Sequence, residues 1–222
     1  MLPKVVIYDS VSVDGAIKDF DVNVPLHYMT AARFAADAYL IGSVTSKTGI
    51  EMFMQTIPPE EPKDFIKPEI DPNDQRPHWV IADSHGIMQG LMHVNRRSEY
   101  AKNIIVLVSN STSKAYLDYL KERNYDTIKT GEDHVDLRVA LEELNSRYGV
   151  KTLLTDTGGV LASVLLEQGL ADEVQLLVTS EIVGKNAVNL FRTLNRMVKM
   201  ELLGSNVLEK EHVLLAYKVL KT

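Results

Sequence analysis

Short runs of apolar, often β-branched residues alternate along this chain with stretches in which apolar residues recur at helical spacing. The runs that predict strands cover residues 4–8, 38–41, 78–82, 104–109, 152–155 and 173–181, with two more near 197–203 and 213–219. Strands that alternate with amphipathic helices are typical of a mainly parallel sheet. The pattern therefore predicts an α/β fold: a mainly parallel central sheet with flanking helices, and a C-terminal antiparallel strand pair.

Helices are predicted between most of these strands, over residues 26–36, 113–123, 136–149 and about 159–169. The third is the best delimited. Asp136 can cap its start, Leu137, Leu141 and Leu144 share one face, and Gly149 can end it in a left-handed conformation. Such stripes indicate core packing, and no function follows from them alone.

Residues 57–77 break this pattern, because they contain six of the chain's eight prolines. A segment so rich in proline cannot form regular structure, and long irregular loops in compact domains are usually functional or disordered. Two interpretations stay open: a flap that borders a site, and a surface excursion or dimer arm. The chain has no internal repeat and no Gly/Ser-rich linker, so we expect a single domain over residues 1–222.

Composition excludes several classes of protein. The chain has 222 residues, a formal net charge of −6 and no cysteine. It can therefore form no disulfide, thiolate metal site or cysteine nucleophile. The acidic balance argues against nucleic-acid binding, which needs clustered Lys and Arg. No apolar run is long enough for a signal peptide or a membrane span, so we expect a cytoplasmic protein without a membrane partner.

Two glycine-containing segments follow predicted strands and could bind phosphate. The first is Gly42, Ser43, Val44 and Thr45; the second is Gly158, Gly159, Val160 and Leu161, preceded by Asp156 and Thr157. Glycine allows a ligand to approach the backbone, and a following helix offers N–H groups to an anion. Neither segment matches the full Rossmann or Walker pattern, and either glycine group could serve only strand ending or helix packing. Their joint presence favours a nucleotide or phosphorylated ligand.

Two further segments carry polar residues at strand ends. Asp83 and Ser84 follow the strand 78–82 and could bind ribose or phosphate, although the same residues suit an ordinary turn. Asp14 precedes Gly15 and could orient a substrate or cap a turn. The six histidines lack metal-ligand spacing with carboxylates, so no metal site is expected and core or solvent roles are favoured for them. The Gly-x-Ser-x-Gly elbow of serine hydrolases is absent.

Taken together, these segments resemble the dihydrofolate-reductase-like pyrimidine reductases of riboflavin biosynthesis, including the C-terminal reductase domain of the bifunctional deaminase/reductase. The resemblance covers nearly the whole chain, with gaps. Its strongest part runs through residues 153–161 and 165–174, and residues 13–15, 40–45 and 82–84 are similar to three further motifs of the family.

The resemblance implies a dihydrofolate-reductase-like fold, a homodimer formed through a sheet edge, and NADPH as hydride donor. It implies that the pyrophosphate of NADPH lies near residues 42–45 and 158–161 and its adenosine side near Asp83 and Ser84. It also implies reduction of a ribosylamino-pyrimidine phosphate, with Asp14 as the substrate-orienting group. Hydride transfer needs no protein nucleophile, metal or cysteine, because the protein's task is to align two reactants.

The sequence departs from the family pattern mainly on the substrate side. Tyr8 stands where an asparagine is common, Thr157 replaces the first glycine of the cluster, and residues 46–50 lack the usual Asp-Pro-Arg-like segment. The cofactor half of the pattern is therefore better preserved. Two alternatives stay open: a paralogous NADPH reductase of another heterocycle, and a non-catalytic dimeric nucleotide-binding protein.

Overall fold

The computed structural model describes residues 1–71, 73–209 and 211–221, so residue 72 of the proline-rich segment lies outside the described part. The chain divides into two compact units. Unit 1 comprises Met1–Pro3 and Asp37–Lys151, and unit 2 comprises Lys4–Ala36 and Thr152–Thr222. Whether the two act as the single domain expected from the sequence stays a prediction.

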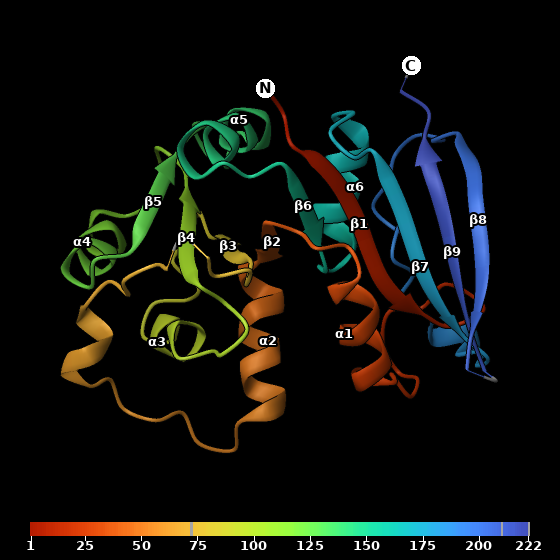
Figure 1. The fold of residues 1–222 in the computed structure, drawn as a ribbon, viewed down its shortest axis with the longest axis horizontal. Coiled ribbons are helices and arrows are strands. Elements are labelled where there is room, and N and C mark those ends of the chain that lie inside the picture. The colour runs from red at the N-terminus through yellow and green to blue at the C-terminus, as the bar shows by residue number, and fades with distance from the viewer. Residues whose placement is uncertain (72, 210, 222) are drawn as a thin grey trace. The chain divides into compact units, whose positions relative to one another are not determined.

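Unit 1 alternates strands and helices. Its elements in chain order are β2 (Ala38–Gly42), α2 (Ser43–Phe53), a 3₁₀ turn (Pro62–Phe65), β3 (His78–Ala82), α3 (Met92–Arg96), β4 (Asn103–Val108), α4 (Lys114–Glu122), β5 (Asp126–Lys129) and α5 (Leu137–Tyr148). The strands lie in the order β5-β4-β3-β2 and all pair in parallel (Figure 1). This is the strand–helix arrangement that the alternating pattern predicts.

Unit 2 combines parallel and antiparallel strands. Its elements are β1 (Lys4–Val11), α1 (Val24–Ala32), β6 (Thr152–Thr155), α6 (Gly159–Glu167), β7 (Glu173–Thr179), a 3₁₀ turn (Gly184–Asn186), β8 (Met200–Leu208) and β9 (His212–Val219). Strand β1 pairs in parallel with β6 and β7, whereas β9 runs antiparallel to both β7 and β8. Both the mainly parallel arrangement and the C-terminal antiparallel pair are confirmed.

Several element boundaries differ from those predicted. Helix α1 begins at Val24 because the Asn23 side chain caps it by accepting a hydrogen bond from the Leu26 amide at 3.1 Å. It ends at Ala32, earlier than expected. Ala35 has a φ of 43°, which lies outside the right-handed helical region, so the helix cannot extend through this residue. Strand β8 covers Met200–Leu208 and not residues 197–203. The four-residue strand β5 and the short helix α3 carry no pattern that predicted them.

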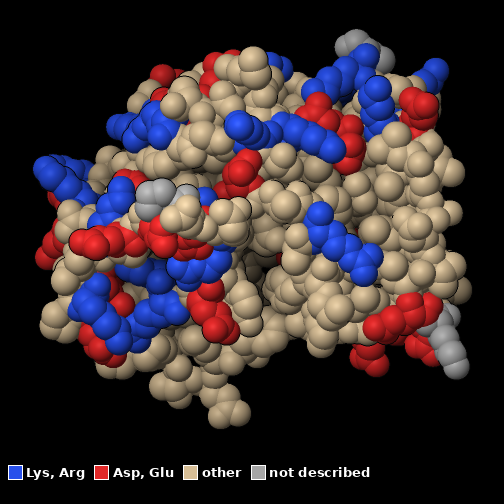
Figure 2. Space-filling model, in the orientation of Figure 1, with Lys and Arg blue, Asp and Glu red and all other residues tan. Residues whose placement is uncertain are grey.

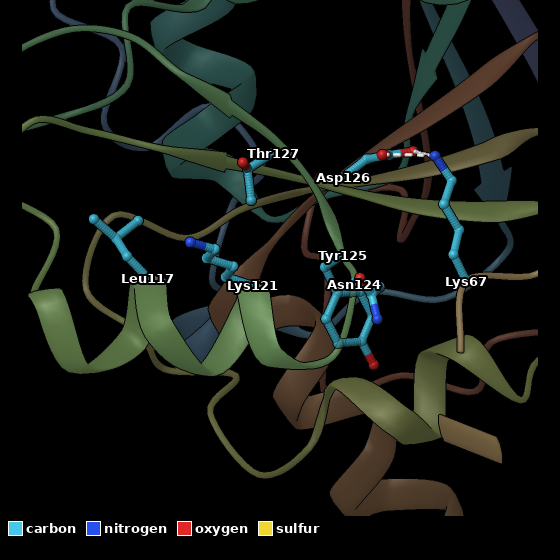
Figure 3. A pocket seen from close by; sticks show the side chains of 7 residues that line it. All are labelled: Lys67, Leu117, Lys121, Asn124, Tyr125, Asp126 and Thr127. Carbon is cyan, nitrogen blue, oxygen red and sulfur yellow. Dashed lines mark hydrogen bonds and ion pairs between the residues drawn. The ribbon is translucent and has the colours of Figure 1, made fainter. Parts of the chain in front are cut away.

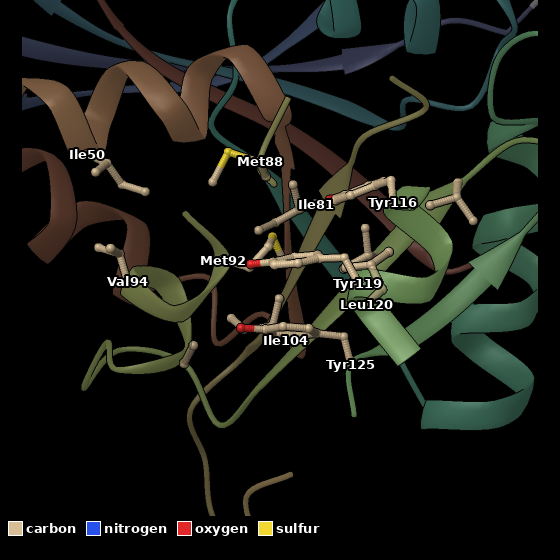
Figure 4. Close-up of a cluster of buried hydrophobic side chains, with 13 residues drawn as sticks. Ile50, Ile81, Met88, Met92, Val94, Ile104, Tyr116, Tyr119, Leu120 and Tyr125 are labelled. Atoms are coloured by element: carbon tan, nitrogen blue, oxygen red, sulfur yellow. The ribbon is translucent and has the colours of Figure 1, made fainter. Parts of the chain in front are cut away.

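The core of unit 1 packs α2, α3 and α4 against β3 and β4. Figure 4 shows three tyrosines of this core, Tyr116, Tyr119 and Tyr125, lying side by side among aliphatic and methionine side chains. Tyr116 and Tyr119 stack with ring centroids 5.9 Å apart. The cluster comprises Ile50, Ile81, Met88, Met92, Val94, Ala101, Ile104, Val106, Val108, Tyr116, Tyr119, Leu120 and Tyr125.

The proline-rich segment of unit 1 is held by arginines. Asp64 is buried and pairs with Arg97, whose Nε lies 2.9 Å from Oδ1 of Asp64. Arg123 donates to both carboxylate oxygens of Glu60 at 2.8 Å, and His93 Nε2 lies 2.8 Å from the carbonyl oxygen of Pro58. The segment is thus fastened to α3 and to the end of α4. Its role as a flap or as a dimer arm stays a prediction.

No helix among the described residues is both long and apolar enough to span a bilayer.

Candidate functional site

The residues predicted to form the site belong to both units, and each group is described within its own unit. Gly42, Ser43, Val44, Thr45, Asp83 and Ser84 belong to unit 1, whereas Asp14, Gly158, Gly159, Val160 and Leu161 belong to unit 2. Their predicted contacts with a cofactor or substrate stay predictions. The local geometry shows what each group can offer to a ligand.

In unit 1, the strand β2 leads directly into helix α2. Gly42 is the N-cap of this helix, and no side chain caps that end. Val44, in the first turn, is 63% exposed. The start of a helix carries a partial positive charge from its backbone N–H groups, so an accessible glycine-capped N-terminus suits an anion such as phosphate.

Asp83 and Ser84 follow β3 and shape the next loop. Asp83 is 1% exposed, and its two carboxylate oxygens accept hydrogen bonds from the amides of Ile87 at 3.0 Å and Met88 at 2.9 Å. The backbone oxygen of Ser84 accepts a hydrogen bond from the Thr112 hydroxyl at 2.9 Å. The Asp83 carboxylate therefore serves the loop itself, while the Ser84 side chain is partly exposed.

In unit 2, Asp14 connects the turn after β1 to the loop after β7. Its carboxylate accepts hydrogen bonds from the Ser12 hydroxyl at 2.6 Å and from the amides of Gly184 at 2.8 Å and Val183 at 3.2 Å. These donors, the Ser12 hydroxyl first, lower the pKa of Asp14 to about 2. The carboxylate is thus ionised at neutral pH and fixes two loops at once.

Helix α6 begins with two glycines that serve different purposes. Gly158 is the N-cap, again with no side-chain cap. At Gly159 a Cβ atom would lie 2.1 Å from the carbonyl oxygen of Leu190, far inside van der Waals contact. Gly159 is therefore required for packing against the loop around Leu190, which fixes where the N-terminus of α6 lies. Val160 is exposed and Leu161 partly exposed.

A hydrogen-bonded network of polar side chains in unit 2 was not predicted from the sequence. His27, on α1, lies with Nδ1 2.7 Å from the Ser10 hydroxyl and with Nε2 3.0 Å from Oδ2 of Asp156. The sequence analysis favours core or solvent roles for the six histidines. His27 is indeed 7% exposed, but both its ring nitrogens are hydrogen-bonded. The one available signal was that Asp156 precedes the glycine cluster directly after a strand.

Asp9 lies on β1, next to Ser10 of this hydrogen-bonded network. Burial raises the pKa of Asp9 well above its usual value, and the negative charge of Asp156 raises it further. The protonated form of Asp9 is therefore favoured to a higher pH than that of an ordinary aspartate.

Two hollows lie among the described residues outside these groups. One, in unit 1, has a volume of about 450 Å³. Figure 3 shows Lys67 across from Lys121 in this hollow. The Lys67 ammonium pairs with the Asp126 carboxylate at 2.7 Å. No predicted site residue lines it. The other, in unit 2, has a volume of about 280 Å³ and is lined by Val11, Gly15, Leu176, Asn189, Leu190, Phe191 and Arg192. It therefore adjoins both the Asp14–Gly15 turn and the residue that contacts Gly159.

The sequence matches the model of the RibD C-terminal domain family over residues 3–214. The fold is similar to that of a pyrimidine reductase-like protein from Corynebacterium diphtheriae, with a TM-score of 0.74 at 15% identity, covering 99% of this chain and 93% of that one. It is also similar to the riboflavin biosynthesis reductase Rib7 of Saccharomyces cerevisiae, with a TM-score of 0.66 at 14% identity and coverages of 99% and 90%.

Dihydrofolate reductase from Enterococcus faecalis, solved with NADP(H), matches with a TM-score of 0.50 at 9% identity, covering 98% of this chain and 97% of that one. The dihydrofolate-reductase-like fold expected from the sequence is thereby confirmed. The chain spans 58% of the length of Acinetobacter baumannii RibD.

Proposed function

This chain belongs to the RibD C-terminal domain family, and from that premise we propose that it is an NADPH-dependent reductase of a ribosylamino-pyrimidine phosphate. The family match over residues 3–214 carries the proposal. The Rib7 and pyrimidine reductase-like structures, which share the fold, support it.

The residues present fit a nicotinamide dinucleotide. Its phosphates are anionic, and the chain has a net charge of −6, so binding depends on local groups and not on a general positive field. The glycine-capped N-termini of α2 and α6 are such groups, because neither has an acidic residue in its first turn. When bound, the cofactor supplies the hydride. The protein supplies orientation.

On the substrate side, Asp14 is the proposed orienting group. Its carboxylate is ionised and held rigidly by Ser12, Val183 and Gly184. A fixed carboxylate favours a ligand that presents hydroxyl or amino donors, as a ribosylamino group does. The apolar hollow beside Gly15 offers a surface of the kind that accepts a flat ring.

The proposal is tested first by binding. Saturating NADPH, at about 100 times its Kd, should stabilise the folded protein by about 2.7 kcal/mol. For a chain of this size the melting temperature should rise by on the order of 5 to 10 °C. If neither NADPH nor NADP⁺ raises it, the cofactor assignment is wrong.

Turnover is tested next, by following the absorbance of the reduced nicotinamide with the ribosylamino-pyrimidine phosphate as substrate. Oxidation that requires this substrate supports the proposal. Oxidation only with another pyrimidine or pterin would identify a paralogous reductase. Binding without turnover on any of these would indicate a nucleotide-binding protein that lacks catalysis.

We further propose that the protein is a homodimer formed through β8. This strand lies at the edge of the sheet of unit 2, and Leu202, Leu203 and Val207 on it are 57%, 52% and 75% exposed. Figure 2 shows that much of the surface over β8 and β9 is uncharged. An exposed apolar edge strand is a template for pairing with another chain. Sedimentation should give a dimer, and Val207→Lys should give a monomer; a monomeric wild-type protein would refute the proposal.

A further inference from the structure

The hollow of about 280 Å³ in unit 2 combines apolar walls with a single charged side chain. Val11 and Leu190 are buried, so these two walls belong to the core, and the partly exposed Leu176 and Phe191 complete the apolar lining. Arg192 is the one charged residue among the described residues that line the hollow. A lining of this kind suits a flat ring that carries a negatively charged group.

The segment that carries Arg192 is fixed on both sides of this residue. On one side, the amide of Leu190 donates a hydrogen bond to the carbonyl oxygen of Gly15 at 3.1 Å. On the other side, the Thr193 hydroxyl donates to the Ser163 hydroxyl at 2.9 Å. The backbone of Arg192 is therefore held at the edge of the hollow without a ligand, and such preorganisation lowers the cost of binding one.

The side chain of Arg192 is exposed and has no partner in the part of the chain that the structure describes. Within residues 1–71, 73–209 and 211–221, no carboxylate or carbonyl oxygen accepts a hydrogen bond from it. By contrast, the guanidinium groups of Arg97, Arg123 and Arg196 all donate to such oxygens. A guanidinium offers five N–H donors in a planar fork that matches a phosphate group. Arg192 thus places unused anion-binding donors beside an apolar hollow.

Asn189 adds a directed polar group to the same lining. Its Nδ2 donates a hydrogen bond to the carbonyl oxygen of Asp14 at 2.6 Å, which fixes the amide. A Cβ atom at position 15 would lie 3.1 Å from this nitrogen, so Gly15 permits the close approach. No described residue donates to Oδ1 of Asn189, which remains an acceptor. The lining therefore favours a ring that carries an amino or N–H donor.

We propose that this hollow is the substrate subsite: an aminopyrimidine ring packs between its apolar walls and donates to Asn189, while Arg192 binds the phosphate group of the substrate. The inference rests on the proposed reductase function and deepens it. Because the phosphate takes no part in hydride transfer, Arg192 binds the ground state and the transition state equally. It therefore determines specificity, by selecting phosphorylated over dephosphorylated heterocycles.

Arg192→Met tests the phosphate contact, because it keeps an unbranched apolar stem and removes the charge. The KM for the ribosylamino-pyrimidine phosphate should rise by about 10-fold or more, as expected for loss of hydrogen bonds to a charged group. The kcat should change little, because the lost interaction is uniform binding. Arg192→Lys, which restores the charge but not the planar fork, should recover part of the KM. Lys199→Met is the matched control, since it removes an exposed positive charge of unit 2 from outside the hollow.

The dephosphorylated substrate separates the phosphate contact from a general disturbance of the hollow. Its KM should be the same in the wild type and in Arg192→Met, because it presents no phosphate to the guanidinium. Leu176→Phe, which narrows the hollow itself, should instead raise the KM of both substrates alike. An unchanged KM for the phosphorylated substrate in Arg192→Met, or an equal rise for both substrates in that variant, would overturn the proposal.

A binding measurement without NADPH tests the subsite without turnover. Cytidine 5′-monophosphate and cytidine carry the same aminopyrimidine ring with and without a phosphate group. In calorimetric titrations the monophosphate should bind more tightly than cytidine to the wild type and to Lys199→Met, and no more tightly than cytidine to Arg192→Met. Equal binding of the two probes to the wild type, or a difference that survives in Arg192→Met, would overturn the proposal. Failure of NADPH to bind would refute the proposed function and leave this measurement in force.

Discussion

Gly159→Ala tests whether the start of α6 is held in place by backbone packing. A Cβ atom at this position would lie 2.1 Å from the Leu190 carbonyl oxygen and 3.0 Å from its carbon. Ordinary contact begins at 3.4 Å, so helix and loop must separate by more than 1 Å. Both are backbone, and no side-chain rotation relieves the clash.

The size of the effect follows from two opposing contributions. Overpacking a close-packed site costs about 1–3 kcal/mol, and the upper part of that range applies because backbone must move. Alanine is favoured over glycine in a helix by roughly 0.5–1 kcal/mol, which offsets part of this cost. We therefore expect a net loss of about 2 kcal/mol, or a melting temperature lower by roughly 4–8 °C.

Gly49→Ala is the matched control. Gly49 lies inside α2, has no positive φ, and a Cβ there would meet nothing within 4 Å. The same substitution should therefore stabilise the protein by about 0.5–1 kcal/mol. Urea unfolding followed by circular dichroism measures both variants. If Gly159→Ala is as stable as the wild type, or both variants change in the same direction, the packing argument fails. Because the shift moves the start of α6, the response to NADPH should also weaken in Gly159→Ala and not in Gly49→Ala.

Two further predictions concern carboxyl groups of opposite pKa shift. Asp64→Asn, which removes the buried ionised partner of Arg97 and leaves it only the longer ion pair with Glu61 at 3.5 Å, should cost about 1–3 kcal/mol and expose the segment around residues 58–66 to protease; equal cleavage rates in variant and wild type would contradict this. The Arg97 guanidinium lowers the pKa of Asp64 to about 2, so its stabilisation is present above the ordinary value of 3.8 and is lost as pH falls towards 2. Asp9 behaves in the opposite sense. Its raised folded-state pKa means that its contribution is fully present below about 3.8 and is lost as pH rises through the folded value. Asp9→Asn should therefore gain stability relative to the wild type as pH rises from 4 to 8, and urea midpoints that differ by the same amount at every pH would contradict this.

The elements that the sequence predicted well carry their own boundary signals. Helix α5 covers Leu137–Tyr148, capped by the Asp136 side chain and ended by Gly149 with a φ of 69°. Its apolar face, cap and C-terminal glycine are all local, so no tertiary information is needed to find it. Strand β5 shows the contrary case. Only Ile128 of its four residues is buried, and an edge strand so short has no alternation to detect.

The candidate site divides in the same way. Glycines that follow a strand and precede a helix form a pattern that is contiguous in sequence, so residues 42–45 and 158–161 could be placed at helix starts in advance, while their binding of phosphate stays a prediction. The purpose of one glycine could not, because the Leu190 carbonyl that excludes a side chain at Gly159 is 31 positions away. Asp83 shows a second role that the sequence could not separate from the first. A polar residue after a strand suggests a ligand contact, which stays a prediction, and its carboxylate also accepts hydrogen bonds from the amides of Ile87 and Met88.

The departure from the family pattern at Tyr8 has a structural counterpart in His27. Tyr8 packs its ring on the His27 ring and donates its hydroxyl to the His27 carbonyl oxygen. A smaller amide side chain at position 8 would provide no such ring contact, so the buried His27 ring would lose this aromatic neighbour. The two residues are 19 positions apart, and neither forms a motif alone. Because His27 in turn contacts Asp156, next to the best-preserved motif, the unusual tyrosine and the familiar glycine cluster belong to one arrangement. A position at which this chain departs from the family pattern thus packs with residues beside the motif that matches it, so the substrate must be tested directly and not transferred from the family.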